Sequence, residues 1–441
     1  MSLIPQYLRD KEKFTTKDFS RERKLPLPFL ITFILSLVSG GKNQGVDGQL
    51  GSFVRNAKRS GIWSKVDTVH RSTITRARSK LKWQLFEDLF YRAVILAYEI
   101  FPNRDEYLWE GMSVVAFDGS KYQLPASPEI REYFDPTSGL GNANNSRGHY
   151  PQCLVSTAYD VFRRIPIARS ITAYNQANER KEACDLIERI PSGSVLLFDR
   201  GYPSYDFIHH MNSHYQGYYS IRCPTTSTFS ALKEFVKSKK QDGTIEIVAP
   251  NSFRRKYGSE AFKCAPVIKL RAVKWTAPDG TKSVLVTNLL NTKKFTKAKI
   301  IALYFKRWSV ETHYRDEKVS LSIERFHSKS VNGVKQEMFA VLVVAVIARA
   351  LSAISCVPRK GKKTTAEPQF KHAAMALGAD IALLCPENPT KAIQALRELI
   401  SEIERVKYHR PIEPRPPQPR VSKAPVNKWR DAKLQKISEA A

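Results

Sequence analysis

Cysteine is scarce in this sequence, and the cysteines that it has do not form close pairs. They are scattered along the 441 residues without any CxxC spacing, at Cys153, Cys184, Cys223, Cys264, Cys356 and Cys385. Zinc sites and disulfide frameworks both need closely or regularly spaced cysteines. The sequence therefore predicts neither, and its cysteine content is typical of a protein in a reducing cytoplasm.

Long apolar runs are also missing. The longest ones, residues 29–38 and 338–348, fall well short of the ~20 residues that cross a bilayer, and Arg349 ends the second. The first residues, MSLIPQYLRDKEKF, do not place an apolar stretch after a basic one, as a secretory signal does. We therefore expect no membrane span and no membrane partner, and we interpret both runs as buried helices.

Acidic residues are few compared with basic ones. The chain has 42 Asp and Glu against 71 Lys and Arg, which leaves a net charge of +29. A surplus of this size favours a polyanionic partner, with nucleic acid as the first candidate. The alternatives are a basic protein without such a partner and a protein that binds acidic membranes, and charge alone does not separate them. Hydrophobic residues make up 42%, so we expect well-packed cores in two to four domains.

The N-terminal region is predicted to be helical. One helix is expected over residues 29–38, and a longer one, capped by Ser72, over residues 73–100. The opening turns of the longer helix are basic and its remainder is apolar, the basic residues being Arg76, Arg78, Lys80 and Lys82. Such a helix suits docking onto DNA phosphates or into a groove. The alternative is a helical domain with a solvated basic face.

From residue 111 the sequence changes to short β-branched and aromatic runs. Strands are predicted over residues 113–117, 154–159, 167–172 and 194–198, with a helix over 179–190 before the last of them. This is the opening order of a ribonuclease-H-like sheet. Residues 218–290 read as mostly β and look like an insertion into this α/β core, and helix returns from residue 296 to about 356, with a break near Ser330.

The C-terminal part is predicted to be helical over residues 366–408 and then to continue as a tail rich in proline and basic residues. The tail is expected to be extended, either contacting DNA phosphates or having no function. The sequence thus predicts a helical DNA-binding domain over residues 1–105 and a core whose two parts cover 106–217 and 291–356. An all-β insertion over 218–290 separates these parts, and a helical C-terminal region covers 357–441.

Two aspartates are predicted to lie at the ends of buried strands. Asp118 is followed by Gly119-Ser120, and Asp199 by Arg200-Gly201. Taken singly, each reads as an ordinary turn in which the Asp bonds nearby backbone. If the two strands are neighbours in one sheet, both carboxylates project from the same edge, where they could share a cation. Hard ions such as Mg²⁺ prefer carboxylate oxygens and keep open positions for water and phosphate.

A third acid lies on a helix with an unusual set of neighbours. Counted at ~100° per residue, one helix face carries Tyr304, Arg307, Glu311 and Lys318. The adjacent stripe is apolar or aromatic and would anchor the helix on the sheet, through Leu303, Val310, Tyr314 and Leu321. The alternative is a solvated face with ion pairs at i,i+4 spacing, Arg307–Glu311 and Glu311–Arg315. That alternative does not explain the two strand-end aspartates or the charge of +29.

The pattern Tyr304, Arg307, Glu311 and Lys318 resembles the YREK signature of insertion-sequence-4 (IS-4) family DDE transposases, with every spacing intact. Residues 117–119 (FDG) and 198–202 (FDRGY) resemble the segments that hold the first and second catalytic Asp of that family, and residues 149–152 (HYPQ) are also similar to it. The resemblance covers residues 114–354.

The resemblance implies a ribonuclease-H-like catalytic core interrupted by a β insertion, and two Mg²⁺ or Mn²⁺ ions per active site. Asp118 is expected to bridge the ions, and Asp199 and Glu311 to hold one each. Arg307 and Lys318 would lie against DNA phosphates and Tyr304 would pack beside them. Related members carry a Trp in the insertion that stacks in the gap left by a flipped base, and Trp275 is the nearest candidate in this chain.

The implied partners are double-stranded DNA, as the element's inverted repeats and as target DNA, and a second copy of the chain in a homodimer. The implied location is the bacterial cytoplasm, in association with the nucleoid. The predicted activity is metal-dependent DNA cleavage and strand transfer. Two alternatives stay open at this point: a DNA-binding protein of the same fold that has lost transposition, and a related structure-specific nuclease.

Overall fold

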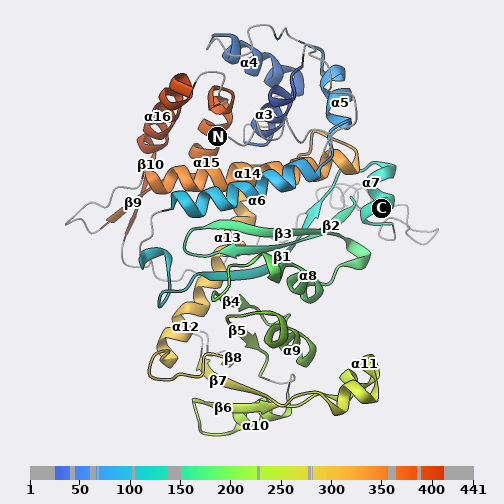
Figure 1. Ribbon diagram of the computed structural model, residues 1–441, viewed down its shortest axis with the longest axis vertical. Coiled ribbons are helices and arrows are strands. Elements are labelled where there is room, and N and C mark those ends of the chain that lie inside the picture. Colours follow the sequence, from blue (N-terminus) through green and yellow to red (C-terminus); the bar gives the residue numbers. More distant parts are fainter. Residues whose placement is uncertain are drawn as a thin grey trace, which may run out of the picture.

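The computed structural model describes residues 25–39, 45–59, 66, 69–101, 105–136, 150–225, 229–276, 280, 282–355, 364–384 and 389–411. An eight-stranded sheet runs through the middle of this part of the molecule (Figure 1). Its strands are β1 Val114–Gln123, β2 Gln152–Asp160, β3 Ile165–Ala173, β4 Val195–Phe198, β5 Tyr218–Cys223, β6 Asp242–Ile247, β7 Ile268–Thr276 and β8 Lys282–Thr287.

The strand order is β3-β2-β1-β4-β5-β8-β7-β6. β1, β4 and β5 run parallel to one another, whereas β2 is antiparallel to both of its neighbours, β1 and β3. All four residues of β4 are buried, as expected for a parallel strand that is covered on both faces. The first five strands therefore form the ribonuclease-H-like sheet that the order of predicted elements indicated, and the α/β fold class is confirmed.

The predicted insertion differs from the structure in two ways. Residues 218–290 begin with β5, which pairs with β4 and so lies inside the core sheet, while β8, β7 and β6 extend that same sheet. The segment is also not all β, because it contains the helices α10 Ser230–Lys237 and α11 Asn251–Lys263. Both are short and rich in charge, and α11 is kinked at Gly258 (φ 90°), so neither shows a long apolar period.

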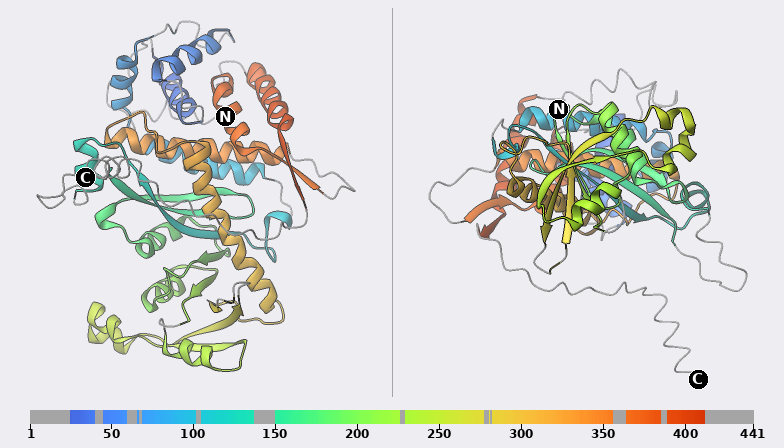
Figure 2. Two further views of the ribbon diagram at one scale, coloured as in Figure 1. Left: turned by 180° about the vertical axis from the view of Figure 1, so that it is seen from behind. Right: turned by 90° about the horizontal axis from the view of Figure 1, so that it is seen from below.

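Helices cover both faces of the sheet. Adjacent residues of a strand point to opposite faces, and on β2 the Ser156 hydroxyl bonds Glu182 of α8 (Glu179–Leu186), whereas Thr157 faces Arg169 and the helix that carries Glu311. Figure 2 shows that helix crossing the sheet on the face hidden in Figure 1, where α8 lies in front. The shorter elements of the core region are η2 Asp105–Tyr107, α7 Pro128–Phe134, η3 Tyr174–Gln176, η4 Ile187–Arg189 and α9 Tyr205–His214.

A second layer of helices packs above the sheet, around α14 Val331–Ile354. The other helices of this layer are α3 Leu27–Val38, α4 Val46–Arg59, α5 Arg71–Ser79, α6 Gln84–Ile100, α15 Phe370–Asp380, η7 Ile381–Leu384 and α16 Pro389–Arg405. α14 begins after Ser330 and ends at Ile354, as the predicted helix with a break near Ser330 indicated. Its length and composition would suffice to cross a membrane, but most of it is buried in the protein, where α6 runs beside it (Figure 1).

The predicted single helix from Ser72 to residue 100 is wrong. α5 ends at Ser79 and α6 begins at Gln84, and the cap of α5 is His70, whose ring nitrogen accepts from the Ser72 amide. Contacts with α14 stabilise the break: Gln336 and Asn332 donate to the Leu81 carbonyl. Tertiary bonds of this kind override the local helical preference of the sequence.

The C-terminal region is only partly helical. α15, η7 and α16 lie within the predicted stretch 366–408, but its two ends belong to an antiparallel ribbon of β9 Thr364–Pro368 and β10 Lys407–Pro411. Alternation of polar and apolar residues is weak in both strands, so the sequence does not reveal them. The predicted tail from residue 412 onwards lies outside the described residues.

Candidate active site

The two aspartates lie on neighbouring parallel strands, as predicted. β1 pairs with β4 through Val114, Val115 and Ala116, and the last of these lies opposite Leu197. Asp118 and Asp199 each follow two residues after that pair, so they reach the same edge of the sheet. One detail differs: Asp118 does not end its strand, because β1 continues to Gln123. Only the buried stretch of β1 ends before Asp118, at Phe117.

Glu311 lies on a helical stretch that is not uniformly α-helical. It consists of α12 Lys297–Phe305, a 3₁₀ turn Lys306–Trp308, α13 Ser309–Arg315 and a π-helical turn Asp316–Ser320, after which the chain leaves the helix. The hydroxyl of Tyr314, on α13, donates to the carbonyls of Asp118 (2.7 Å) and Val155 (3.1 Å). This phenol therefore fixes the Glu311 helix directly onto the backbone of the strand that carries Asp118.

Arg307 joins the two acids from the helix to the sheet. Its guanidinium lies 2.9 Å from Glu311 Oε1 and 3.7 Å from Asp118 Oδ1, and its side chain is only 8% exposed. The Arg307–Glu311 pair is the i,i+4 ion pair that a solvated helix face would also show. In the structure, however, Arg307 is buried and also lies near Asp118. Burial raises the pKa of Asp118 to about 7. The cation of Arg307 opposes this shift, whereas Asp199, Glu311 and Glu179 add to it.

Of the other two signature residues, Tyr304 lies at the site and Lys318 does not. Tyr304 is buried beside Arg307, and burial raises its pKa, an effect that the nearby Asp199 increases. The ammonium of Lys318 donates to the carbonyl of Lys121 (2.6 Å) and lies over the ring of Tyr122 (4.7 Å), further along β1. Lys318 lies within the π-helical turn, where the rotation per residue differs from that of an α-helix, and its contact with a DNA phosphate stays a prediction.

A buried polar cluster lies behind the Glu311 helix. Glu317, fully buried, accepts from Arg169 of β3 at 2.9 and 3.0 Å, from His313 at 3.0 Å and from the Tyr122 hydroxyl. Burial alone would raise the pKa of Glu317, but Arg169 and His313 lower it to about 2. A buried carboxylate is tolerated when it is fully paired in this way, and here the pairing locks the π-helical turn to β1 and β3.

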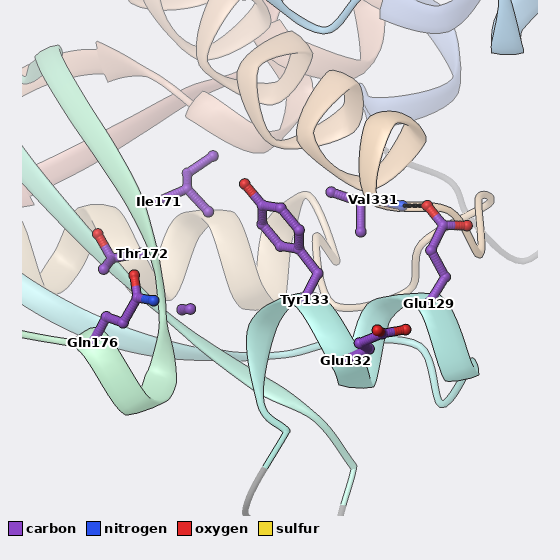
Figure 3. Close-up of a pocket in the computed structure, with 8 residues that line it drawn as sticks. Glu129, Glu132, Tyr133, Ile171, Thr172, Gln176 and Val331 are labelled. Atoms are coloured by element: carbon purple, nitrogen blue, oxygen red, sulfur yellow. Dashed lines mark hydrogen bonds between the residues drawn. The ribbon is translucent and has the colours of Figure 1, made fainter.

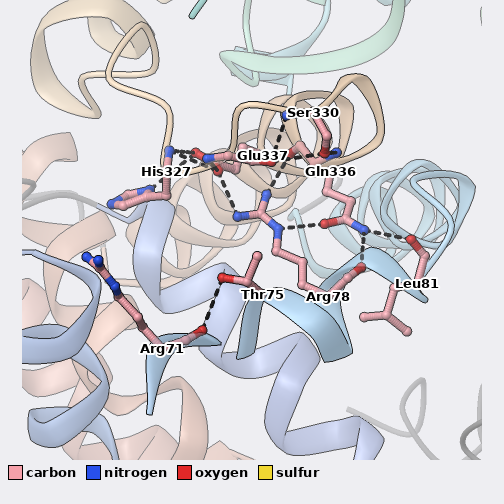
Figure 4. Close-up of polar contacts among 10 residues, drawn as sticks. Arg71, Thr75, Arg78, Leu81, His327, Ser330, Gln336 and Glu337 are labelled. Carbon is pink, nitrogen blue, oxygen red and sulfur yellow. Dashed lines mark hydrogen bonds and ion pairs between the residues drawn. The ribbon is translucent and has the colours of Figure 1, made fainter. Parts of the chain in front are cut away.

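The predicted DNA-contact residues are in different environments. Arg76 is exposed on α5 and Lys80 is half-buried after it. Arg78 is buried, and the prediction that it contacts DNA is wrong: its guanidinium pairs with Glu337 (2.9 Å) and donates to Gln336 (2.7 Å) of α14 (Figure 4). Because Arg78 is two residues after Arg76 on the helix, its side chain points in a different direction, toward the core, where it pairs with Glu337 of α14.

Trp275 is placed near the site by its neighbours. On β7 it packs edge-on against Phe305 of α12 (5.1 Å between ring centres), and the guanidinium of Arg222 lies 5.7 Å from its ring. The indole nitrogen is buried without a hydrogen-bond partner among the described residues. Stacking of this ring on a base stays a prediction. His149, the first residue of the family-like segment before β2, lies outside the described residues.

One cavity in the described part of the chain lies away from these acids. About 660 Å³ in volume, it lies between α7, β3 and the start of α14 (Figure 3). Its lining includes Glu129, Tyr133 and Thr172 but none of the predicted site residues. An open sheet edge that receives a long polymer need not form an enclosed pocket, so the carboxylate cluster identifies the site better than the cavity does.

Sequence reasoning missed a further acid beside this cluster. Glu179, the first residue of α8, lies next to Gly119 and Gly201, which follow the two aspartates. Burial raises the pKa of Glu179, and the Asp199 and Glu182 carboxylates raise it further. The only signal in the sequence is the capping pattern of Asn178 and Glu182, which predicts the start of a helix but not what that helix faces.

A ribonuclease-H-like sheet with two strand-borne aspartates and a helix-borne glutamate defines the class of carboxylate-dependent polynucleotide-processing proteins. Comparison with known proteins identifies the family. The chain belongs to the family described as "Transposase DDE domain", which matches residues 109–347, more than half of its length.

Two curated proteins of Escherichia coli (strain K12) are similar to this chain. "Transposase InsG for insertion sequence element IS4" is 24% identical over 287 residues, 63% of this chain and 60% of that protein. "Putative transposase InsZ" is 28% identical over 144 residues, 32% of this chain and 46% of that protein. The chain thus matches about half of the length of these relatives, and the similarity confirms the resemblance to IS-4-type transposases.

One solved structure, a piggyBac transposase synaptic complex with hairpin DNA, is 12% identical in sequence to this chain. The match covers 95% of this chain and 85% of the chain in that structure. The TM-score of 0.38 is too low to support any conclusion about the present chain.

DDE transposases generally use divalent metal ions, and the donor set of this site fits them chemically. The carboxylates of Asp118, Asp199 and Glu311 are hard oxygen ligands, and their mutual repulsion contributes to the raised pKa of Asp118. As they stand, no three acidic, histidine or cysteine side chains in the described part of the chain are arranged to hold an ion. The guanidinium of Arg307 lies between Asp118 and Glu311 and balances part of their charge.

Proposed function

We propose that the chain is a DNA transposase of a bacterial insertion sequence, which binds the terminal inverted repeats and catalyses metal-dependent cleavage and strand transfer. The observation that carries this proposal is the placement of Asp118 and Asp199 on adjacent strands, with Glu311 linked to Asp118 through Arg307. Family membership of residues 109–347 supports the same activity.

The three acids would hold two Mg²⁺ or Mn²⁺ ions, with Asp118 between them and Asp199 and Glu311 each on one side. When bound, such ions activate the attacking water or 3′-hydroxyl and stabilise the leaving oxygen. Tyr314 holds the Asp118 backbone against the Glu311 helix, so the acids on sheet and helix keep a fixed relation. A fixed relation matters because the reacting groups must be held in line.

The cations near the acids would hold the DNA backbone. The planar guanidinium of Arg307 would hold a phosphate through two hydrogen bonds. Tyr304 packs beside it, and Lys318 would contact a phosphate further along β1. Arg76 and Lys80 on the N-terminal helices would contact phosphates of the inverted repeat, and Trp275 is the proposed stacking residue for a base.

Transposition needs two element ends to be held together, so we expect a homodimer on double-stranded DNA, as the inverted repeats and then the target. The expected location is the bacterial cytoplasm, in association with the nucleoid. Both expectations follow from the proposed reaction, because the ends and the target lie on chromosomal or plasmid DNA.

A plasmid excision assay tests the proposal. The wild-type chain should excise a marker flanked by the element's inverted repeats, whereas Asp118→Asn, Asp199→Asn and Glu311→Gln should abolish excision and leave binding of the ends nearly unchanged. Glu188→Gln is a suitable control, because Glu188 is exposed and lies at the far end of the α8 segment. Binding without excision by the wild type would indicate a DNA-binding protein that has lost transposition, and cleavage without joining would indicate a nuclease.

A further inference from the structure

Glu179 projects from the start of α8 into the space beside Asp118. A side chain at Gly119 would collide with it, since a Cβ atom there would lie 2.5 Å from Glu179 Oε1 and 2.7 Å from its Cδ. The absence of a side chain at residue 119 is therefore what admits this carboxylate. The half-buried Glu179 carboxylate makes no hydrogen bond or ion pair to any residue that the structure describes.

The same carboxylate also approaches Asp199. A Cβ atom at Gly201 would lie 3.0 Å from Asp199 Oδ1 and 4.0 Å from Glu179 Oε2, so both carboxylates approach the loop that follows Asp199. Like charges this close repel each other unless a cation joins them or a proton neutralises one. Glu179 thus passes a glycine beside each aspartate: Gly119 directly after Asp118, and Gly201 two residues after Asp199.

The position of Glu179 is fixed by contacts that do not involve its own carboxylate. Glu182, one helical turn later, accepts from the hydroxyls of Ser156 on β2 and Ser170 on β3 (3.0 Å to Ser170). Arg180 donates to the Gly201 carbonyl at 2.8 Å, which ties the start of α8 to the loop that follows Asp199. Contacts of Glu182 and Arg180 therefore hold α8 so that its first residue, Glu179, faces the acids. The Glu179 carboxylate itself takes no part in these contacts.

We propose that Glu179 is a fourth acid of the active site, whose carboxylate binds the divalent ion held by Asp118 and Asp199. This inference rests on the proposed function. Hard divalent ions take about six oxygen ligands, of which proteins supply several as carboxylates. A fourth carboxylate adds to the attraction for the ion and restricts where it lies between the strand-borne aspartates.

Mn²⁺ binding to the full chain in the absence of DNA tests the proposal without any reaction. Free Mn²⁺ is followed by electron paramagnetic resonance as protein is titrated with the metal. Glu179→Gln, which keeps the shape and removes the charge, should weaken Mn²⁺ binding at least tenfold, the lower end of what loss of supporting groups costs metal sites. Glu188→Gln, which removes one charge from the exposed end of the same segment, should bind as the wild type does.

Gly119→Ala provides an independent variant. The added methyl group meets only the flexible end of Glu179 and the backbone φ is ordinary, so the chain should fold while the carboxylate is displaced. Its Mn²⁺ affinity should fall to about that of Glu179→Gln, and the double variant should be no weaker than either one, because both remove the same contact. Thermal unfolding without metal should stay close to wild type for all three variants.

Glu179→Gln with wild-type Mn²⁺ affinity would overturn the proposal, as would fully additive losses in the double variant. Asp118→Asn separates this failure from failure of the proposed function. If Asp118→Asn loses Mn²⁺ binding while Glu179→Gln keeps it, the metal site stands and only the fourth acid is refuted. If Asp118→Asn also binds normally, the ion is not held at this site and both proposals fall.

Discussion

Arg307 has a different position from the one that its spacing in the sequence indicates. The residue was expected to face DNA phosphates, but its guanidinium lies between Asp118 and Glu311. Although burial alone would lower the pKa of Arg307, Tyr304 and Asp118 raise it, so the cation is firmly retained. Arg307 therefore balances part of the charge of the two acids, and its contact with a DNA phosphate stays a prediction.

Removing this cation should separate metal binding from cleavage. Arg307→Ala should bind Mn²⁺ at least as tightly as the wild type, because the ion no longer displaces a guanidinium, while cleavage slows about a hundredfold through loss of phosphate positioning. Single-turnover cleavage of a labelled DNA end, beside Mn²⁺ titration, measures both. Lys306→Ala, at the exposed neighbouring position, is the matched control. Loss of Mn²⁺ binding in Arg307→Ala would contradict this account.

The raised pKa of Asp118 predicts a pH dependence of stability in the absence of metal. The folded pKa of about 7 lies above the ordinary value of 3.8, so the folded chain binds a proton that the unfolded chain has released. This contribution is fully present below pH ~4 and is lost as the pH rises to about 7, at about 1.4 kcal/mol per pKa unit. Urea unfolding in EDTA should show this loss for the wild type. Asp118→Asn should be flatter over the same range, and an equal slope would refute the assignment.

Local sequence patterns were enough to select the three acids whose role in catalysis is proposed. Asp118, Asp199 and Glu311 follow from buried runs that end in an acid and from one helical spacing, which are local patterns. Glu179 and the burial of Arg78 could not be predicted, because each depends on a partner outside its own element. Glu179 depends on Gly119 within β1 and Gly201 after β4, and Arg78 depends on Glu337.

Within the Glu311 helix, departures from α-helical geometry decide which side chains share a face. The 3₁₀ turn at Lys306–Trp308 and the π-helical turn at Asp316–Ser320 flank α13. Tyr304 and Glu311 both approach Arg307, although the 3₁₀ turn lies between them. Lys318 lies within the π turn and contacts Lys121 and Tyr122 of β1. Local sequence does not reveal this turn; the tertiary pairing of Glu317 accompanies it.

The Glu317 cluster should be the main anchor of this helix. Glu317→Gln leaves Arg169 buried without its counterion, and we expect a loss of about 3–5 kcal/mol in the free energy of unfolding. The low pKa of Glu317, about 2 against an ordinary 4.5, means that its contribution is present above pH ~4.5 and is lost as the pH falls toward 2. Urea unfolding at neutral and acid pH measures both effects. Glu324→Gln, at a half-exposed acid near the same helix, should change stability little.

At the scale of the whole molecule, the N-terminal helices are bound to the core rather than forming an independent domain. α5 and α6 contact α14 through Arg78, Leu81 and Trp83. Removal of residues 1–105 would therefore uncover α14, so point variants are a better test of DNA binding than truncation. The α/β class and the order of the core strands were predictable because each strand has a local run of β-branched and aromatic residues. The docking of the helical layers was not, because it depends on contacts between distant segments.

Arg76 and Arg78 lie two residues apart and should behave differently. If Arg76 contacts a phosphate, Arg76→Gln should reduce the slope of log affinity against log salt by about 0.9, with stability unchanged. Arg78→Gln should leave that slope unchanged and lower the melting temperature, because it leaves Glu337 without its buried partner. Fluorescence anisotropy with end DNA across a salt series, together with thermal unfolding, distinguishes them. A salt slope that falls with Arg78 and not with Arg76 would reverse the assignment.

The Arg78–Glu337 contact also governs the order in which a growing chain can fold. The partners of Arg78 lie about 258 residues further along, and Glu337 also accepts from the backbone amides of His327 and Ser328, which follow the Glu311 helix. Contacts so distant in sequence form late. During synthesis the N-terminal helices therefore cannot complete their packing until α14 has left the ribosome, because Arg78 lacks its ion-pair partner Glu337 until then. The segment expected to recognise DNA is therefore completed only after the catalytic residues have been made.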